Sequence, residues 1–171
     1  AIEKYRVTSG QFVPVMFVRM LKLPESVRNS YDVSSIKRVV HAAAPCPVDI
    51  KMQMIDWWGP VIDEYYSSSE GAGITFITAE EWLKRPGSVG KPLLGEAHVL
   101  DENGDEVPRG QEGQIYFAMA GMEFVYHKDP EKTAERFVDG LDGTHDENVA
   151  VGVVVVEQNG QHCRPAGSRT E

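Results

Sequence analysis

The first half of the chain alternates stretches of helical spacing with short runs suited to strands. Apolar residues recur every three or four positions over 15–23 and 47–58, which predicts helices with one face on a core. Runs rich in β-branched and aromatic residues at 36–41 and 61–66 are strand-sized and follow turn residues. Strands that alternate with helices over short connections are typical of an α/β fold, in which helices flank a parallel sheet.

The second half has a different pattern. A short helix at 81–84 is followed by a link rich in turn residues at 86–92. The segment 97–107 is expected to form a hairpin with Asn103-Gly104 at its tip, and 114–117 is expected to form another strand. A small antiparallel sheet, or a β-barrel-like subdomain, is the fold that this pattern predicts. Asp129-Pro130 then has the residues of a helix start, and Val151 to Glu157 is a candidate strand.

Composition narrows the range of partners. The 171 residues carry a formal net charge of -9, which disfavours a nucleic-acid backbone or an anionic membrane as the partner. The charge does not exclude ATP, which needs only local donors and a metal ion. No run approaches membrane-spanning length, and the two cysteines, Cys46 and Cys163, indicate no disulfide scaffold, so we expect a cytoplasmic protein. Cys46 is expected to be a small packing residue and not a nucleophile.

Candidate chemistry gathers at the end of the second predicted strand. In parallel sheets ligands bind at the carboxyl ends of the strands, and here Tyr66 is followed by hydroxyl residues and a carboxylate. Tyr66 offers a flat face for a base, Ser69 a hydroxyl for a phosphate, and Glu70 a hard oxygen ligand for Mg²⁺. The alternative is an ordinary polar turn with a solvated carboxylate.

A second candidate loop follows the first predicted strand. Ala43, Ala44 and Pro45 are small or compact residues, and small residues at a strand end let the backbone approach a ligand closely. The alternative is a tightly packed corner between a strand and a helix, with no ligand.

The order of these segments resembles the adenylate-forming (AMP-binding) superfamily, and within it the bacterial long-chain fatty-acyl-CoA synthetases. The resemblance runs from about Ile2 to Phe137 and rests on an ordered series of segments. These are Val13-Pro14-Val15-Met16-Phe17, Ala43-Ala44-Pro45, Tyr66-Ser67-Ser68-Ser69-Glu70, Gly87-Ser88-Val89-Gly90-Lys91-Pro92, Gly113-Gln114-Ile115 and Pro130-Glu131-Lys132-Thr133-Ala134.

The resemblance implies an acid–thiol ligase that joins a fatty acid to AMP, releases pyrophosphate, and passes the acyl group to coenzyme A. It further implies ATP and Mg²⁺ as cofactors and residues 43–45 against one face of the adenine. Tyr66 would cover the other face, beside Ser67. Ser69 would contact phosphate, and Glu70 would bind the metal. Glu70 and Ser69 are thus the candidate catalytic residues.

The sequence departs from the family pattern at several places. Ser67 stands where relatives have Gly, and Ser69 where they have Thr, so Ser67 would be strained if its backbone needed a positive φ. The phosphate-binding loop with its Lys is not found in this sequence. A weak alignment to the family places Val153 at the position of the Asp that would bind the ribose hydroxyls. From 162 onward we find no resemblance to the family.

These departures, and a start on Ala1 that reads like a helix already under way, predict an internal fragment that lacks ligase activity by itself. The missing remainder of the same enzyme would then be its partner. The alternatives are a non-catalytic remnant or nucleotide-binding module, and an unrelated α/β domain with an accidental likeness. Three regions are expected: an α/β subdomain with the adenine-binding loops (1–84), an antiparallel subdomain with a helix (85–137), and a divergent tail (138–171).

Overall fold

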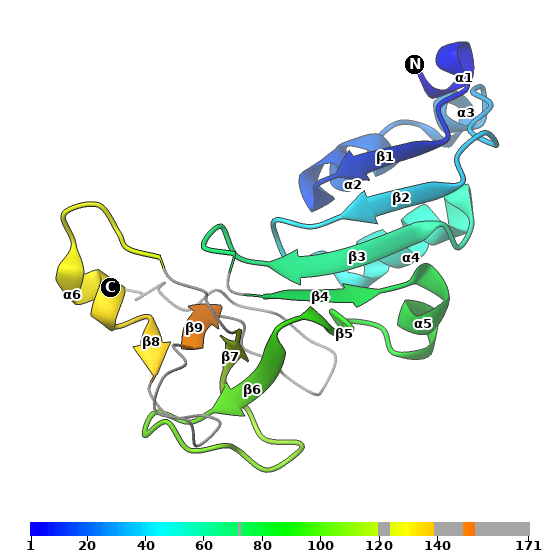
Figure 1. Ribbon diagram of the computed structural model, residues 1–171. Coiled ribbons are helices and arrows are strands. Elements are labelled where there is room, and N and C mark those ends of the chain that lie inside the picture. Colours follow the sequence, from blue (N-terminus) through cyan, green and yellow to red (C-terminus); the bar gives the residue numbers. More distant parts are fainter. Residues whose placement is uncertain (72, 120–123, 139–148, 153–171) are drawn as a thin grey trace, which may run out of the picture. The chain divides into compact units, whose positions relative to one another are not determined.

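The structure is a computed structural model that describes residues 1–71, 73–119, 124–138 and 149–152 (Figure 1). The chain forms two compact units. The first unit consists of Ala1–Tyr66 and Phe76–Lys91, and the second of Ser67–Thr75 with the chain from Pro92 onward. Each unit is described by itself below.

The first unit is built on parallel strands. Its sheet has the strand order β1-β2-β3-β4-β5. The residues at one end of β3, β4 and β5 belong to the second unit by the division given above. Both β1 and β3 pair with β2 in parallel, so the predicted α/β fold is confirmed, but the sheet is mixed, because β4 runs opposite to β3 in Figure 1. The elements are α1 (Ile2–Tyr5), β1 (Ser9–Phe12), α2 (Pro14–Leu21), α3 (Glu25–Arg28), β2 (Arg38–His41), α4 (Val48–Trp58), β3 (Ile62–Ser67), β4 (Ile74–Ile77), α5 (Ala79–Lys84) and β5 (Lys91–Leu94).

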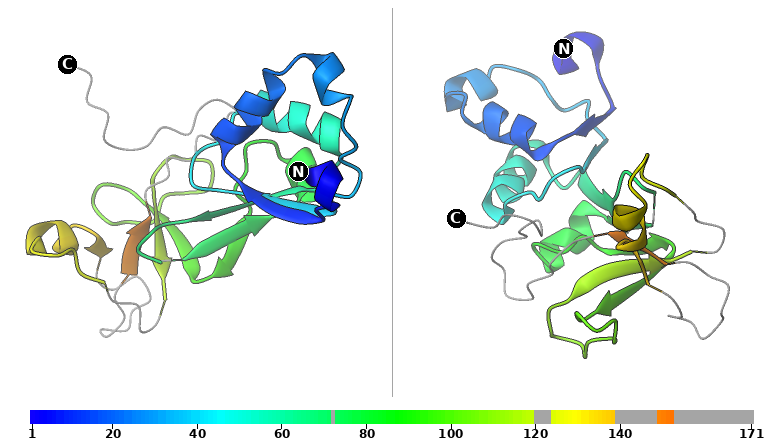
Figure 2. Two further views of the ribbon diagram at one scale, coloured as in Figure 1. Left: turned by 90° about the horizontal axis from the view of Figure 1, so that it is seen from above. Right: turned by 90° about the vertical axis from the view of Figure 1, so that its left-hand side faces the viewer.

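Helices α2 and α4 pack against each other and lie on one face of strands β1 to β3 (Figures 1 and 2). Phe17, Met54 and Ile62 are fully buried where the helices meet the sheet. Each such side chain contributes about 1.5–3 kcal/mol by leaving water. Val15, the first apolar residue of the helical pattern, is about half exposed, whereas Phe17 fills the core.

Several boundaries differ from the sequence prediction. β4 was not predicted. The last residues of the predicted link at 86–92 belong to β5, which begins at Lys91. α5 begins at Ala79 and not at residue 81, because Thr78 and Glu81 form a capping box that satisfies the first backbone N–H groups. The carboxylate of Asp63 also accepts a hydrogen bond of 2.9 Å from the backbone nitrogen of Ala79.

The second unit contains an antiparallel sheet with the strand order β6-β7-β9-β8. Its core includes Leu100, Ile115 and Phe117. The antiparallel sheet is confirmed, whereas its closure into a barrel stays a prediction. The predicted strand at 151–157 begins earlier, and residues 153–157 lie outside the described residues. The elements are β6 (Glu96–Leu100), β7 (Gln114–Ala118), α6 (Pro130–Ala134), β8 (Phe137–Val138) and β9 (Val149–Gly152).

The predicted hairpin at 97–107 forms only next to its turn. Leu100 makes an isolated antiparallel bridge with Glu106, and Gly104 takes a φ of 86° in the turn between them. The carboxylate of Asp101 accepts hydrogen bonds from the backbone nitrogens of Asn103 and Asp105, which holds the turn closed. The main partner of β6 is therefore β7. Within the described ranges, no helix is long and apolar enough to cross a bilayer.

Candidate nucleotide-binding site

The two predicted adenine-binding segments lie at the ends of neighbouring strands of the first unit, residues 43–45 just after β2 and Tyr66 in the last residues of β3. His41 and Glu64 are paired across β2 and β3, and each is two positions before a predicted site residue, Ala43 or Tyr66. Because the strands are parallel, both segments leave the sheet at the same edge. Residues 43–45 are exposed and Tyr66 is half-buried. The edge therefore presents small side chains and an aromatic ring from adjacent strands.

Ala43 has an unusual backbone conformation. Its φ of 74° lies in the left-handed region, which costs a residue with a Cβ roughly 1–2 kcal/mol. Alanine has the smallest side chain that carries this cost. Strained backbone is often found where a loop is shaped for a ligand, so the conformation is consistent with a binding loop.

A buried ionic cluster in the first unit joins residues of β2, α4 and β3. Lys51 of α4 is fully buried, and its Nζ lies 2.7 Å from Oε2 of Glu64. The Nε2 of His41, also fully buried, lies 3.2 Å from the same oxygen. The Lys51 ammonium also stands 4.6 Å from the ring centroid of Trp82. The carboxylate of Glu64 in β3 thus contacts side chains of β2 and α4.

The cluster shifts the pKa values of its members. Burial lowers the pKa of Lys51, although the carboxylate of Glu64 opposes this effect. Burial alone would raise the pKa of Glu64, but His41 and the charge of Lys51 outweigh it, and the net shift is downward. Lys51 and Glu64 therefore form an ion pair in the interior, where charges persist only if they are paired.

Cys46 lies near this cluster, and burial followed by the charge of Glu64 raises the pKa of its thiol to about 12. We expect iodoacetamide at pH 8 to modify Cys46 about a thousandfold more slowly than a free thiol, because the thiolate is the reactive form. The measurement is mass spectrometry of a Cys163→Ser chain over time, with the same chain in urea as the control. Modification at the same rate with and without urea would contradict the raised pKa.

The serine-rich segment that carries Glu70 belongs to the second unit and is closed at its base. The Ser67 hydroxyl donates a hydrogen bond of 2.8 Å to the carbonyl oxygen of Gly73. The backbone nitrogen of Gly71 donates to the carbonyl oxygen of Ser68, and Gly71 has a φ of 76°. Ser67 is not among the residues with positive φ, so the strain expected for a serine at this position does not arise.

Glu70 has a tyrosine partner from a distant part of the same unit. The hydroxyl of Tyr126 donates a hydrogen bond to Oε1 of Glu70, and both side chains are half-buried. This hydrogen bond is the main cause of the lowered pKa of Glu70, and the charge of Arg136 also contributes. The same contact raises the pKa of Tyr126. Glu70 is thus a carboxylate at neutral pH, and Tyr126 retains its proton.

The oxygen ligands near Glu70 suit a cation that is also coordinated by a nucleotide and by water. Glu70 offers one carboxylate, and Ser69, one position earlier, has an exposed hydroxyl. No group of three or more His, Cys, Asp or Glu side chains suited to a metal occurs among the described residues. Mg²⁺ is usually bound by one or two carboxylates together with substrate phosphates and water, so the chemistry fits Mg²⁺ with a nucleotide and not a protein-only metal centre.

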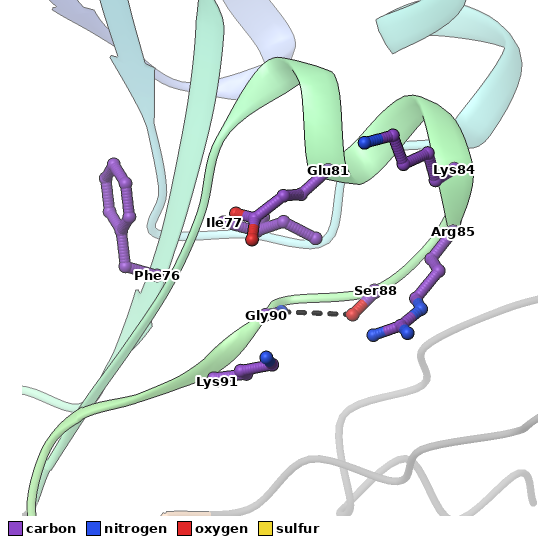
Figure 3. Close-up of a pocket in the computed structure, with 8 residues that line it drawn as sticks. All are labelled: Phe76, Ile77, Glu81, Lys84, Arg85, Ser88, Gly90 and Lys91. Carbon is purple, nitrogen blue, oxygen red and sulfur yellow. Dashed lines mark hydrogen bonds between the residues drawn. The ribbon is translucent and has the colours of Figure 1, made fainter.

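The first unit also contains a cavity of about 280 Å³ away from the predicted site residues. Figure 3 shows it between α5 and the segment from Ser88 to Lys91. Lys84, Arg85 and Lys91 line the cavity together with Glu81. The pKa of Glu81 is lowered, first by its hydrogen bonds with Thr78 and then by the neighbouring lysines. None of the residues predicted to bind the nucleotide lines this cavity.

Sequence reasoning found only part of the contacts in this region. It selected Glu70 but not Tyr126, which is 56 positions away. It gave no role to Lys51. No periodic signal links such pairs, because they meet only through the fold. Val153, the predicted replacement for the ribose-binding Asp, lies outside the described residues.

Comparison with known proteins gives the class of the fold. A long-chain-fatty-acid–CoA ligase (FadD1) from Archaeoglobus fulgidus superposes with a TM-score of 0.71 at 19% identity, over 96% of this chain and 35% of that one. ATP-bound MatB from Rhodopseudomonas palustris superposes with a TM-score of 0.69 at 24% identity, over 91% of this chain and 30% of that one. At these identities the likeness shows the fold.

Sequence comparison is more specific. The AMP-binding enzyme family matches residues 1–127. The medium/long-chain-fatty-acid–CoA ligase FadD8 of Mycobacterium tuberculosis is 31% identical over 142 residues, which cover 81% of this chain and 24% of that protein. The acyl-CoA ligase sidI of Aspergillus fumigatus is 30% identical over 149 residues, covering 84% and 25%. The chain belongs to the AMP-binding enzyme family, and it spans about a quarter of the length of these curated relatives.

Proposed function

We propose that this chain supplies the adenine-binding and metal-binding residues of an ATP-dependent acyl-CoA ligase. The observation that carries the proposal is the parallel pairing of β2 and β3, which brings residues 43–45 and Tyr66 to one edge of the sheet. The family match and the relatives named as acyl-CoA ligases support the reaction class. A fatty acid as the acid substrate and coenzyme A as the acceptor rest on the relatives' names and on the sequence resemblance.

In the proposed first step, a carboxylate oxygen of the acid attacks the α-phosphorus of ATP and pyrophosphate leaves. Residues 43–45 and Tyr66 would hold the adenine between them, which fixes the nucleotide for in-line attack. The Ser69 hydroxyl would donate a hydrogen bond to a phosphate oxygen, and Glu70 would hold Mg²⁺. The ion, when bound, neutralises charge that develops on the phosphates. The acyl group of the resulting adenylate would then pass to the thiol of coenzyme A.

The role of Tyr66 is tested by nucleotide binding. Tyr66→Ala is expected to weaken binding of AMP, or of a non-hydrolysable acyl-adenylate mimic, about tenfold, because a base loses its aromatic stacking partner. Isothermal titration calorimetry of this chain measures the affinity. Tyr31→Ala is the matched control, since Tyr31 is an exposed tyrosine of the same unit that follows no sheet strand.

Unchanged affinity in Tyr66→Ala would remove Tyr66 from the adenine site. An equal loss in Tyr31→Ala would show that the effect is general to the unit and not specific to the strand edge. If the unaltered chain binds neither ligand, the adenine-binding role of this region is refuted for the chain as it stands.

A further inference from the structure

The structure places one tyrosine on the carboxylate proposed to bind the metal. The hydroxyl of Tyr126 donates to Oε1 of Glu70, and both residues lie in the second unit. A carboxylate has two oxygens with about four acceptor positions in all, so the hydrogen bonds from Tyr126, Ser68 and the backbone of Glu70 leave part of this capacity for a cation. The contact restricts the orientation of the Glu70 carboxylate and still leaves it able to bind a cation.

The backbone of Tyr126 is itself fixed by a hydrogen bond to α6. Its amide nitrogen donates a hydrogen bond of 2.9 Å to Oγ1 of Thr133 in α6. That hydroxyl in turn donates to the carbonyl oxygen of Asp129, 2.8 Å away. The side chain of Asp129 accepts from the backbone nitrogen of Lys132 and so caps the helix. The start of α6 thus fixes the backbone from which the tyrosine extends.

The ring of Tyr126 is also contacted by neighbouring side chains. The Nζ of Lys132 stands 4.6 Å from the ring centroid, within the range of a cation–π interaction. The ring of Phe124 meets it edge to face, with centroids 5.5 Å apart. These contacts do not involve the hydroxyl, so a phenylalanine at this position would keep them and lose the hydrogen bond to Glu70 together with the interaction of the hydroxyl with Arg136.

We propose that Tyr126 is a positioning residue that orients the Glu70 carboxylate for a nucleotide-bound divalent cation. The inference rests on the proposed function, because it gives Glu70 the metal. It adds a residue that acts through Glu70 and touches neither the nucleotide nor the ion. The geometric reason is that Tyr126 makes the main hydrogen bond to the Glu70 carboxylate, beside smaller contributions from Ser68 and the backbone of Glu70, and that Tyr126 is itself anchored at backbone and ring.

The test compares ATP binding with and without Mg²⁺ in Tyr126→Phe, with no carboxylic acid present. We expect the tightening of ATP binding by Mg²⁺ to fall about tenfold, as is common when the partner of a metal ligand is removed, with the metal-free affinity unchanged. Tyr116→Phe is the matched control, because it removes a hydroxyl that donates to Gln114 elsewhere in the same unit. Its Mg²⁺ effect is expected to equal that of the unaltered chain.

A second readout needs no ligand. Without nucleotide or metal, hydrogen–deuterium exchange at the backbone of 67–71 is expected to be faster in Tyr126→Phe than in Tyr116→Phe. A merely structural role would lower the overall stability or the metal-free affinity instead, and either change without a loss of the Mg²⁺ effect overturns the inference.

Glu70→Gln separates the inference from the proposed function. If Glu70→Gln abolishes the Mg²⁺ effect and Tyr126→Phe leaves it intact, the positioning role is overturned and the metal role of Glu70 stands. If Glu70→Gln also leaves the effect intact, Glu70 is not a metal ligand, and both proposals are overturned. A loss in both variants, with Tyr116→Phe unaffected, supports both.

Discussion

Glu64→Ala is expected to destabilise the first unit by about 3–5 kcal/mol. The substitution leaves the ammonium of Lys51 buried without its carboxylate, and an uncompensated charge in the interior is among the largest single penalties in a protein. All three tryptophans, at 57, 58 and 82, lie in this unit, so their fluorescence in a urea titration reports its unfolding. Glu80→Ala is the matched control, because Glu80 is an exposed acid of the same unit.

A double variant tests the mechanism behind this loss. When Lys51→Met accompanies Glu64→Leu, both buried charges are gone, and much of the stability is expected to return, since apolar side chains of similar size often replace a buried ion pair without cost. If Glu64→Ala and Glu80→Ala unfold at the same urea concentration, the ion pair contributes nothing to stability. If the double variant is no better than Glu64→Ala, the loss arises from packing and not from the unpaired charge.

Gly90→Ala is expected to have the second large effect, a loss of about 2–5 kcal/mol in the first unit. Gly90 has a φ of 91°, and a Cβ at this position would come within 2.0 Å of the carbonyl oxygen of Phe76 and 2.8 Å of the Cβ of Ile77. Alanine at this φ is strained by roughly 1–2 kcal/mol, and backbone must shift to relieve the overlap. Tryptophan fluorescence in urea again measures the change.

Gly59→Ala provides the control for this prediction. Gly59 has a similar φ of 85°, but a Cβ there would meet nothing within 4 Å. Its expected loss is therefore only the backbone strain, about 1–3 kcal/mol at its φ of 85° and ψ of 178°. Equal losses in the two variants would show that the close approach of Gly90 to β4 relaxes freely and that the positive φ alone matters.

The parts of the fold that the sequence predicted are those with a local signal. Helices α2 and α4 have apolar residues at helical spacing, and β2 and β3 follow turn residues, so their existence was correctly predicted to within a few residues. β4 was missed because its four residues, Ile74–Ile77, stand between glycines and a helix start and show no alternation. Short runs of this kind acquire their structure from the neighbouring strands.

The interior charges could not be predicted for a different reason. Lys51 interrupts the apolar positions of α4, and a lysine on a helix is almost always placed toward water. The structure buries it because Glu64 of β3 stands opposite, thirteen positions later in the chain. The candidate site shows the same limit. Tyr66, Ser69 and Glu70 were selected from one continuous segment, whereas Tyr126 meets Glu70 only because β7, α6 and their connections bring the two together.

The parallel register of β1, β2 and β3 also sets how this unit reaches its fold. Ser9 is paired with Arg38, and Val39 with Ile62, so neither strand pair can form as a local hairpin. The chain must first close a long loop through a helical crossover, and its entropy is lost before any ladder hydrogen bond compensates for it. Lys51 lies on the second of these crossovers, and its carboxylate partner lies on the strand that the crossover delivers. We therefore expect the ion pair to form only when β3 joins the sheet, with Lys51 hydrated until its carboxylate partner arrives.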